Sequence, residues 1–343
     1  MRIVRRIAKW AGLLVLALLV SCAVYQQIGA AIDDYTVPQT GRIVAVNGHA
    51  VHVVCTGAGP RTFVLDAGLG AWSMEWYRLQ PILAKTGRVC AYDRPGFGTS
   101  EAIDHAYDGV TAADELHALL PAAGIAKPFV YVGHSLGANF GEIYAARYPR
   151  DVEALVLIEP GVPKDMLSNF DPIGRADALA MPATCGALCY AAWAAGYLGI
   201  PRFVVHYIFP GARGIGNDSA ALAQYHAGAS RSSFGAVGIA YFEALPKISF
   251  QVSDIKSFGA LPVLFLASQI APPGDPGEDM VKWRQGQLAY FSARAATSSH
   301  GEGPVTIAAS THASMVMAEP QVHQTAAAIA AFLAHRTPLH PVP

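Results

Sequence analysis

The pentapeptide Gly133-His134-Ser135-Leu136-Gly137 is the stretch of this chain whose residue types could carry out chemistry. It matches G-x-S-x-G, in which a serine occupies a strained turn and small flanking residues let a strand and a helix approach closely. The chain has 33 glycines, so the match needs support from its context. Val130-Tyr131-Val132 precede it as a β-forming apolar run, and helical spacing follows until Pro149. We therefore predict Ser135 as a nucleophile, the alternative being a serine in a glycine-rich turn.

A serine at such a turn would act by acyl transfer, and that reaction has definite requirements. The hydroxyl is a poor nucleophile at neutral pH, so a histidine must take its proton and a carboxylate must hold the imidazole in the right tautomer. The negative oxygen that develops on the substrate also needs preorganised hydrogen-bond donors. The rest of the chain must supply and position these groups.

Composition indicates a globular protein with material for a large core. Of the 343 residues, 52% are hydrophobic and 14% are charged, which favours one compact unit with an insertion. The net charge is −1, and lysines and arginines cluster only in the first nine residues. We therefore expect a small-molecule partner and no nucleic acid. The oligomeric state is left open.

Residues 1–34 differ from the rest of the chain. Four basic residues precede an uncharged run of 23 residues, Trp10–Ile32, which Asp33 and Asp34 close. The run is long enough to span a bilayer, with its basic flank in the cytoplasm. A cleaved signal peptide and a lipid-anchored Cys22 after the lipobox-like Leu19–Ser21 are two other interpretations. All three export the remaining chain, whereas a buried core helix would not.

Strands and helices alternate after this segment. Arg42–Val46 and Val51–Cys55 read as a hairpin through Asn47-Gly48. Further strands are predicted at Thr62–Leu65, Arg88–Tyr92, Val130–Val132, Leu155–Ile158, Pro262–Ala267 and Val305–Ala309. Helical pattern separates most of them, and this order predicts an α/β fold with a mostly parallel sheet covered by helices on both faces.

The chain resembles the α/β-hydrolase fold superfamily, in particular its serine esterases and lipases. The resemblance rests on LDAGLG at Leu65–Gly70, YDRPGFGTS at Tyr92–Ser100, GHSLG at Gly133–Gly137, LVLIEP at Leu155–Pro160 and STHASM at Ser310–Met315. It implies an eight-stranded sheet, with a core formed by residues 41–162 and 255–336. Ala138 departs from the second glycine of many relatives, and Ala67-Gly68 stands where relatives often carry His-Gly.

Residues 163–254 interrupt this core with a segment rich in alanine and aromatic residues, which is too long for a loop. By resemblance they form a helical lid between strands six and seven. Their aromatic residues are candidates to line an apolar pocket, although packing against the core is the more ordinary role for any one of them. These candidates are Trp193, Tyr197, Phe203, Tyr207, Phe234 and Tyr241.

The resemblance also implies the partners of the serine, in the chain order serine, acid, histidine. His312 follows the last predicted strand and is expected to be the base. The acid usually follows strand seven, but Ser268 to Ala271 contain no carboxylate there. We therefore predict Glu159, at the end of strand six, and keep Asp275 and Asp279 as alternatives. Glu159 could instead brace the lid hinge.

The oxyanion donors are expected to be the backbone N–H groups of Leu69 and Leu136, by analogy with the family. The side chain of His134 should point away from the nucleophile. Asp93 and Arg94 are expected to order the loop beside the elbow. We predict no metal and no cofactor, because no group of His, Asp or Glu has ligand spacing.

Five cysteines fit an exported protein. In the fold that the chain resembles, strands two and four are neighbours, and this implies a Cys55–Cys90 disulfide. Cys185 and Cys189 form a second disulfide or remain as buried thiols, and Cys22 is left over.

Together these features predict an exported or membrane-anchored serine hydrolase that cleaves carboxylic esters with an apolar part. The same triad also serves amide or peptide hydrolysis and acyl transfer to other acceptors. From a different class, the chain could be a catalytically silent homologue that binds a ligand.

Overall fold

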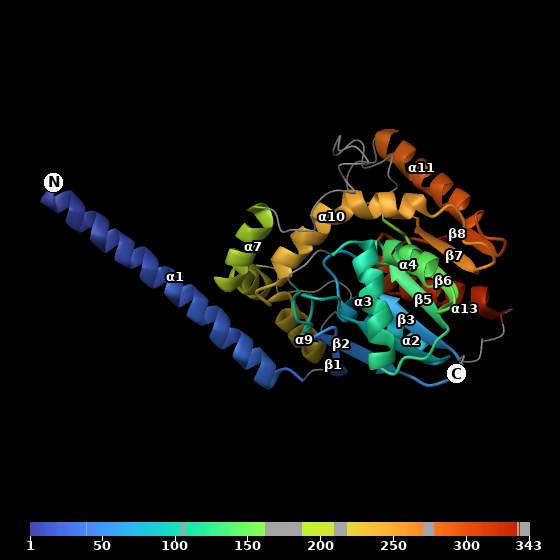
Figure 1. Ribbon diagram of the computed structural model, residues 1–343, viewed down its shortest axis with the longest axis horizontal. Helices are drawn as coiled ribbons and strands as arrows, with labels where there is room; N and C mark the ends of the chain where they lie inside the picture. Colours follow the sequence, from blue (N-terminus) through green and yellow to red (C-terminus); the bar gives the residue numbers. More distant parts are fainter. Residues whose placement is uncertain are drawn as a thin grey trace.

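The protein contains one eight-stranded sheet, seen in Figure 1 at the centre of the body. The structure is a computed structural model that describes residues 1–38, 40–103, 107–161, 187–208, 218–269, 278–334 and 336. The strands are β1 Arg42–Val46, β2 His49–Thr56, β3 Thr62–Asp66, β4 Arg88–Tyr92, β5 Phe129–His134, β6 Val152–Ile158, β7 Val263–Ser268 and β8 Gly301–Ile307. Their order is β1-β2-β4-β3-β5-β6-β7-β8. Only the β1–β2 and β2–β4 pairs are antiparallel, so the predicted fold class is confirmed.

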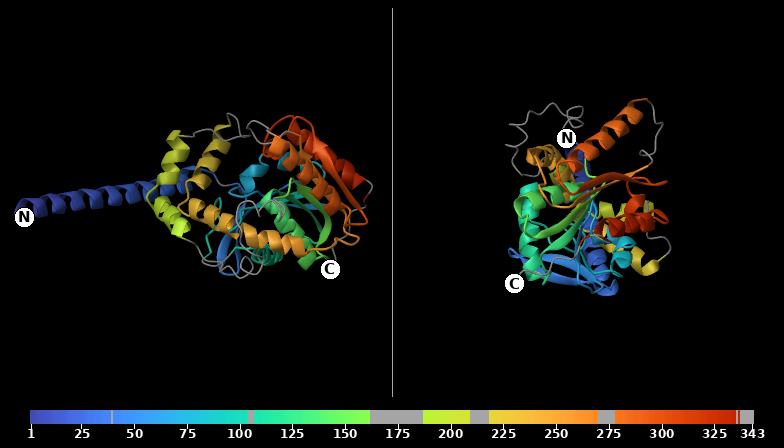
Figure 2. Two further views of the ribbon diagram at one scale, coloured as in Figure 1. Left: turned by 90° about the horizontal axis from the view of Figure 1, so that it is seen from above. Right: turned by 90° about the vertical axis from the view of Figure 1, so that its right-hand side faces the viewer.

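Helices cover both faces of the sheet (Figure 2). The α-helices of the described residues are α1 Arg2–Thr36, α2 Leu79–Leu83, α3 Gly109–Ala122, α4 Leu136–Arg147, α7 Ala187–Tyr197, α8 Ile200–Phe203, α9 Ser219–Ala229, α10 Phe234–Asp254, α11 Glu278–Ala295, α12 Ser314–Met317 and α13 Gln321–Ala334. The described residues also form a short 3-10 helix, η1 (Ser73–Trp76), and a π-helix, η2 (Val204–Ile208). Helices α3, α4 and α11 share one apolar core, and α2 and α13 share the other.

Strand β5 shows how the sequence divides between these two cores. Tyr131 belongs to the core under α3 and α4, whereas Val130 and Val132 belong to the opposite core. Successive side chains of a strand point to opposite faces. Because both faces are covered, the strand reads as a continuous apolar run, which is typical of parallel sheets.

The predicted elements agree with the structure closely, with one clear difference at β8. The hairpin turn lies at Asn47-Gly48, where both residues have positive φ. Strand β8 begins at Gly301, four residues before the predicted Val305. Gly303 and Pro304 are poor strand formers, but pairing with buried β7 determines the strand here.

Between β6 and β7 the described chain is helical, as predicted, and residues 162–186 and 209–217 lie outside the described part. The aromatic residues expected to line an apolar pocket differ in their burial. Trp193, Tyr197, Phe203 and Tyr207 are exposed, and Tyr241 is fully buried against Phe97 and Tyr107. Composition identified the apolar residues but carries no information about which side of these helices meets the core.

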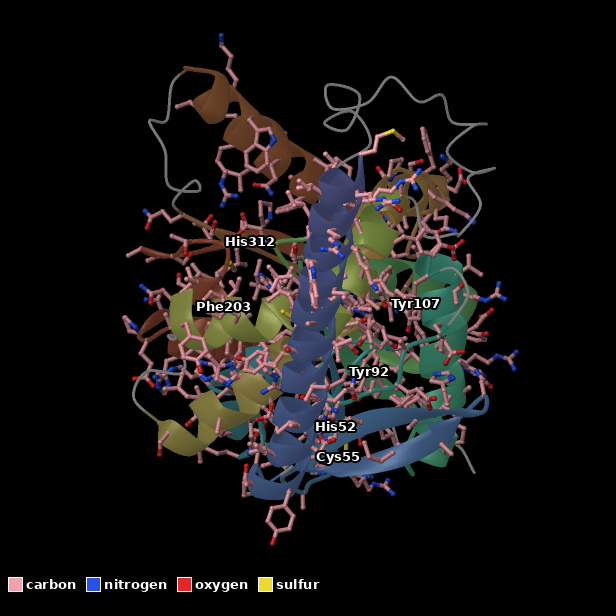
Figure 3. The ribbon with its side chains drawn as sticks, turned by 90° about the vertical axis from the view of Figure 1, so that its left-hand side faces the viewer. His52, Cys55, Tyr92, Tyr107, Phe203 and His312 are labelled. Atoms are coloured by element: carbon pink, nitrogen blue, oxygen red, sulfur yellow. A yellow bond between two sulfur atoms is a disulfide. The ribbon has the colours of Figure 1, made fainter. Side chains whose placement is uncertain are left out.

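Helix α1 projects away from the body (Figure 1) and crosses in front of it when viewed from the N-terminal side (Figure 3). Its apolar residues are exposed, and its length and composition suffice to cross a membrane. Its C-terminal part contacts α7 and α9.

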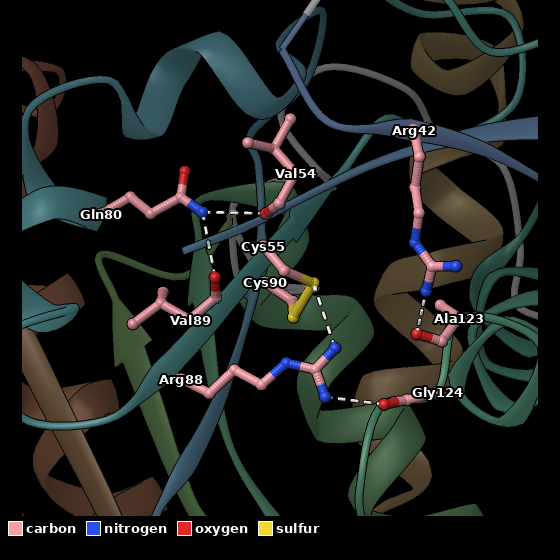
Figure 4. Close-up of a disulfide and its surroundings, with 9 residues drawn as sticks. All are labelled: Arg42, Val54, Cys55, Gln80, Arg88, Val89, Cys90, Ala123 and Gly124. Atoms are coloured by element: carbon pink, nitrogen blue, oxygen red, sulfur yellow. Dashed lines mark hydrogen bonds between the residues drawn. A yellow bond between two sulfur atoms is a disulfide. The ribbon is translucent and has the colours of Figure 1, made fainter. Parts of the chain in front are cut away.

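A disulfide joins Cys55 and Cys90, as predicted (Figure 4). The two residues are opposite each other in the antiparallel pairing of β2 with β4, with their Cα atoms 4.0 Å apart. It ties the antiparallel edge of the sheet to the parallel part. Cys185 and the side chain of Cys189 lie outside the described residues.

Candidate active site

Ser135 lies at the sharp turn between β5 and α4, where the sequence predicts it. Its φ is +52° and its ψ is −118°, a conformation that L-residues rarely adopt and that concentrates at functional sites. The flanking glycines explain how the turn fits. A Cβ on Gly133 would lie 2.5 Å from the Gly137 carbonyl oxygen, and one on Gly137 would lie 2.2 Å from that of Asp66. Strand and helix therefore approach at a distance that only glycine permits.

Glu159 directly follows β6 and is 4% exposed. It also has a positive φ, +45°. Its Oε2 accepts from the Ser268 backbone N–H at 2.9 Å, and its Oε1 accepts from the Ser268 hydroxyl at 3.0 Å and from Arg284 at 2.5 Å. A carboxylate so deeply buried keeps its charge only with such partners.

His312 lies after β8, with Nδ1 3.8 Å from Glu159 Oε2. This is an ion-pair distance, somewhat longer than a hydrogen bond. The imidazole is 44% exposed, so one side of it faces the solvent. The structure thus brings the predicted acid and base together, across 153 positions of sequence.

Backbone hydrogen bonds join the segment around Ser135 to the segment around Glu159. The Ser135 N–H donates to the Ile158 carbonyl at 2.9 Å, and the Gly161 N–H donates to the Ser135 carbonyl at 3.2 Å. The two strained residues therefore follow neighbouring strands at the same edge of the sheet. His312 reaches this edge from β8, two strands further along.

The loop after β3 lies against the serine. A Cβ on Gly68 would lie 3.4 Å from Ser135 Cβ. Both backbone groups of Gly68 are engaged, since its N–H donates to Glu75 Oε2 at 2.7 Å and its carbonyl accepts from Arg94. The next N–H along the loop belongs to Leu69, and it donates to no acceptor within the described chain. Leu136 begins α4, so its N–H has no acceptor within the helix.

His134 and Glu75 form a buried brace between this loop and the histidine loop. His134 Nδ1 lies 2.8 Å from Glu75 Oε1, and Nε2 lies 3.0 Å from the His312 carbonyl oxygen. Both neighbours are acceptors, so both ring nitrogens carry a proton. Burial lowers the pKa of His134, but the Glu75 carboxylate outweighs it and raises that pKa above its ordinary value. The ring also packs on His312, with centroids 4.5 Å apart.

Sequence reasoning missed three of these residues: Glu75, Ser268 and Arg284. Ser268 is the last residue of β7 and carries no carboxylate, and nothing in its local sequence links it to Glu159. Arg284 lies on α11 and Glu75 on η1, and no local sequence pattern around either residue predicts its partner in the site. Asp275 and the side chain of Asp279 lie outside what the structure describes. Within the described chain, no three His, Cys, Asp or Glu residues form a cluster that could hold a metal ion.

Comparison with known proteins places this arrangement in context. A family model described as alpha/beta hydrolase fold matches residues 61–182. Uncharacterized protein YbdG of Bacillus subtilis (strain 168) is 26% identical over 157 residues, which are 45% of this chain and 48% of that protein. The chain thus matches about half the length of that relative.

Two solved structures resemble the chain over most of its length. Epoxide hydrolase CorEH has a TM-score of 0.60 at 20% identity, covering 86% of this chain and 98% of its own. A membrane phospholipase A, described as a bacterial virulence factor, has a TM-score of 0.58 at 19% identity, covering 97% and 96%. At these identities the likeness is one of fold.

The charge state of Glu159 gives a prediction about stability. Burial raises its pKa, but His312, Arg284 and Ser268 outweigh burial and lower the pKa from 4.5 to about 2. Because the pKa of Glu159 is lower in the folded than in the unfolded protein, its charge stabilises the fold at pH values above about 4.5. This stabilisation is lost as the pH falls from about 4.5 to about 2. The shift corresponds to about 3 kcal/mol. Denaturant unfolding should show a stability gap between wild type and Glu159→Gln that narrows over this range.

The control is Glu302→Gln, at an exposed glutamate paired with Arg336. The difference in unfolding free energy between wild type and this variant should be smaller and should change little over the same pH range. A Glu159→Gln gap that stays constant between pH 6 and pH 2.5 would contradict the assignment of a charged, stabilising carboxylate.

Proposed function

Since this chain belongs to the α/β-hydrolase fold superfamily, we propose that it is a serine hydrolase that cleaves carboxylic esters through an acyl-enzyme intermediate. Ser135 is the nucleophile, His312 the general base and Glu159 the acid that orients it. The observation that carries the proposal is the strained serine at the elbow on the same sheet edge as a buried glutamate paired with a histidine.

The steps of the reaction follow from these roles. The Ser135 hydroxyl oxygen attacks the ester carbonyl while His312 takes its proton, and the oxygen of the tetrahedral intermediate is stabilised by the N–H groups of Leu69 and Leu136. His312 then protonates the leaving alcohol as the C–O bond breaks, leaving an acyl-Ser135. Water, deprotonated by His312, attacks this ester, and Ser135 regains its proton as the acid departs. The negative Glu159 stabilises the imidazolium in both steps.

Glu75, His134 and Arg284 position these groups without touching the substrate in this scheme. Glu75 fixes the oxyanion loop through Gly68, and His134 holds the His312 backbone. Arg284 occupies the Oε1 side of Glu159. His312 therefore meets the carboxylate on its Oε2 side.

Amide or peptide hydrolysis and acyl transfer remain alternatives, because the same triad carries out all of these reactions. A silent ligand-binding homologue is the alternative from another class. A fluorophosphonate probe separates silent from active chains, and a panel of p-nitrophenyl esters of increasing acyl length determines the substrate preference.

We also place the catalytic domain outside the cytoplasm, held at the membrane by α1. The basic residues before Trp10 favour a cytoplasmic N-terminus. The exposed, apolar surface of α1 supports a bilayer location, since it would be unfavourable in water.

Ser135→Ala should abolish probe labelling and lower ester turnover by roughly 10⁴-fold or more, because only the nucleophilic oxygen is lost. The melting temperature should remain close to that of wild type. Ser73→Ala, at another buried serine, serves as the control and should retain labelling. Turnover by Ser135→Ala near the wild-type level would rule out the serine mechanism.

Glu159→Gln should lower kcat by about 10³-fold or more, because the imidazolium loses its counter-charge. Asp275→Asn and Asp279→Asn should retain nearly all activity. Steady-state kinetics on one p-nitrophenyl ester distinguishes these outcomes. A large loss in either aspartate variant, with Glu159→Gln active, would assign the acid to the segment after β7.

Deleting residues 2–21 tests the anchor while leaving the part of α1 that contacts the helical insertion. After alkaline carbonate extraction, the full-length protein should remain in the membrane pellet, and the deletion variant should appear in the supernatant. Immunoblotting of both fractions measures this. Complete extraction of the full-length protein would show that α1 does not span the bilayer.

A further inference from the structure

Helix α1 consists of two parts with different surroundings. Residues 1–21 are exposed on every side. From Cys22 onward, residues recur that are partly or fully covered: Cys22, Ala23, Gln26, Gly29, Ala30 and Asp33. This spacing places them on one face of the helix. That face lies against the helical insertion, with α7 and α9 in contact with α1.

Polar contacts fix this junction. Arg202 of α8 is 5% exposed, and it donates to Gln26 Oε1 at 3.2 Å and to Asp33 Oδ2 at 2.7 Å. Gln26 in turn donates to the Ser230 carbonyl at 2.9 Å. A Cβ on Gly29 would lie 2.7 Å from the Arg202 guanidinium, so a larger residue here would displace that side chain from its present position. The insertion is therefore held in a defined position along α1.

The position of the junction along α1 sets the depth of the insertion relative to a bilayer. The uncharged run Trp10–Ile32 is about 34 Å long at 1.5 Å per residue, close to the hydrocarbon thickness of about 30 Å. Gln26 lies about 10 Å along the helix before Asp33. When the run spans the hydrocarbon, Asp33 lies at the boundary with the headgroups, and Arg202 of α8, which bonds both Asp33 and Gln26, lies between that boundary and a depth of about 10 Å. The hydrogen bonds of Gln26 then satisfy a polar group at membrane depth.

The surface that the insertion exposes beside α1 is apolar and aromatic. We call it the cap face; its exposed large side chains are Leu188, Tyr190, Trp193, Tyr197, Ile200, Phe203, Tyr207 and Ile208. Between residues 187 and 208 the only Asp, Glu, Lys or Arg is Arg202, which is buried. Elsewhere beyond α1, the described chain exposes large apolar side chains only at scattered positions, namely Ile43, Leu69, Phe242, Val281 and Val305. Figure 3 shows Phe203 to one side of α1.

We propose that the cap face is a second membrane contact, inserted into the headgroup layer of the bilayer that α1 crosses. This rests on the proposed membrane location of α1. Tyrosine and tryptophan prefer this layer because their rings are apolar and their O–H and N–H groups remain hydrated. An exposed apolar patch of this kind marks an interaction surface. A Cβ on Gly199, between Tyr197 and Ile200 of the cap face, would lie 3.0 Å from the Tyr25 ring of α1. This contact with the membrane helix selects lipid over a second copy of the chain as the occupant.

Quenching of Trp193 by brominated lipids tests the proposal in the full-length protein. The protein is reconstituted into phosphatidylcholine vesicles with acyl chains brominated at carbons 6 and 7, and into unbrominated vesicles. Comparing wild type with Trp193→Phe isolates the emission of Trp193. We expect it to lose at least half its intensity in brominated vesicles. Trp283, on α11 far from α1 (Figure 1), is the matched control through Trp283→Phe and should lose little.

Trp10 reports separately on α1, through Trp10→Phe. If Trp10 is quenched and Trp193 is not, α1 is inserted and the cap-face proposal is wrong. If neither is quenched, the membrane location proposed for α1 fails first and the cap-face proposal falls with it. If brominated lipid does not quench Trp193 but its emission wavelength changes with the protein-to-lipid ratio, the cap face contacts a second copy of the chain. That result would overturn the proposal.

Discussion

The buried guanidinium of Arg94 is the interaction on which the geometry of this site depends most. Arg94 is 1% exposed and pairs with Asp66, which is equally buried. It also donates to the carbonyl oxygens of Ala67 and Gly68. Burial disfavours the charge on Arg94, but Asp66 outweighs burial, and the pKa of Arg94 lies above its ordinary value. Arg94 therefore stays charged, and its hydrogen bonds to the Ala67 and Gly68 carbonyls fix the loop after β3.

The same guanidinium connects three parts of the fold. The rings of Phe97, Phe140 and Tyr241 lie 5.3–5.8 Å from its central carbon. They belong to the loop after β4, to α4 behind the elbow and to α10 of the insertion, respectively. Planar stacking and five donors make arginine suited to this role and lysine unsuited. Removing it would leave buried carbonyls without donors, at a cost of about 1–3 kcal/mol each.

Local sequence determines where Ser135 and Glu159 lie, because each directly follows a strand whose apolar pattern is clear, whereas His312 is expected from the resemblance to a family. Contacts between distant elements could not be predicted in this way. Glu75 meets His134 across 59 positions, and Arg284 meets Glu159 across 125; no spacing rule links such residues. The exposed aromatic residues of α7 and α8 show the same limit, since composition reports that a side chain is apolar but not what covers it.

The two strained residues, Ser135 and Glu159, illustrate how the sheet positions a site. Each has positive φ, which costs about 1 kcal/mol or more for such residues. Backbone bonds at the strand ends oppose this cost: the Ser135 N–H donates to the Ile158 carbonyl, and the Glu159 N–H donates to that of Leu266. The hydrogen bonding of β5 to β6 and of β6 to β7 thus continues one step beyond each strand. Strand register therefore determines where the backbones of Ser135 and Glu159 lie, while Ser268 and Arg284 hold the Glu159 carboxylate.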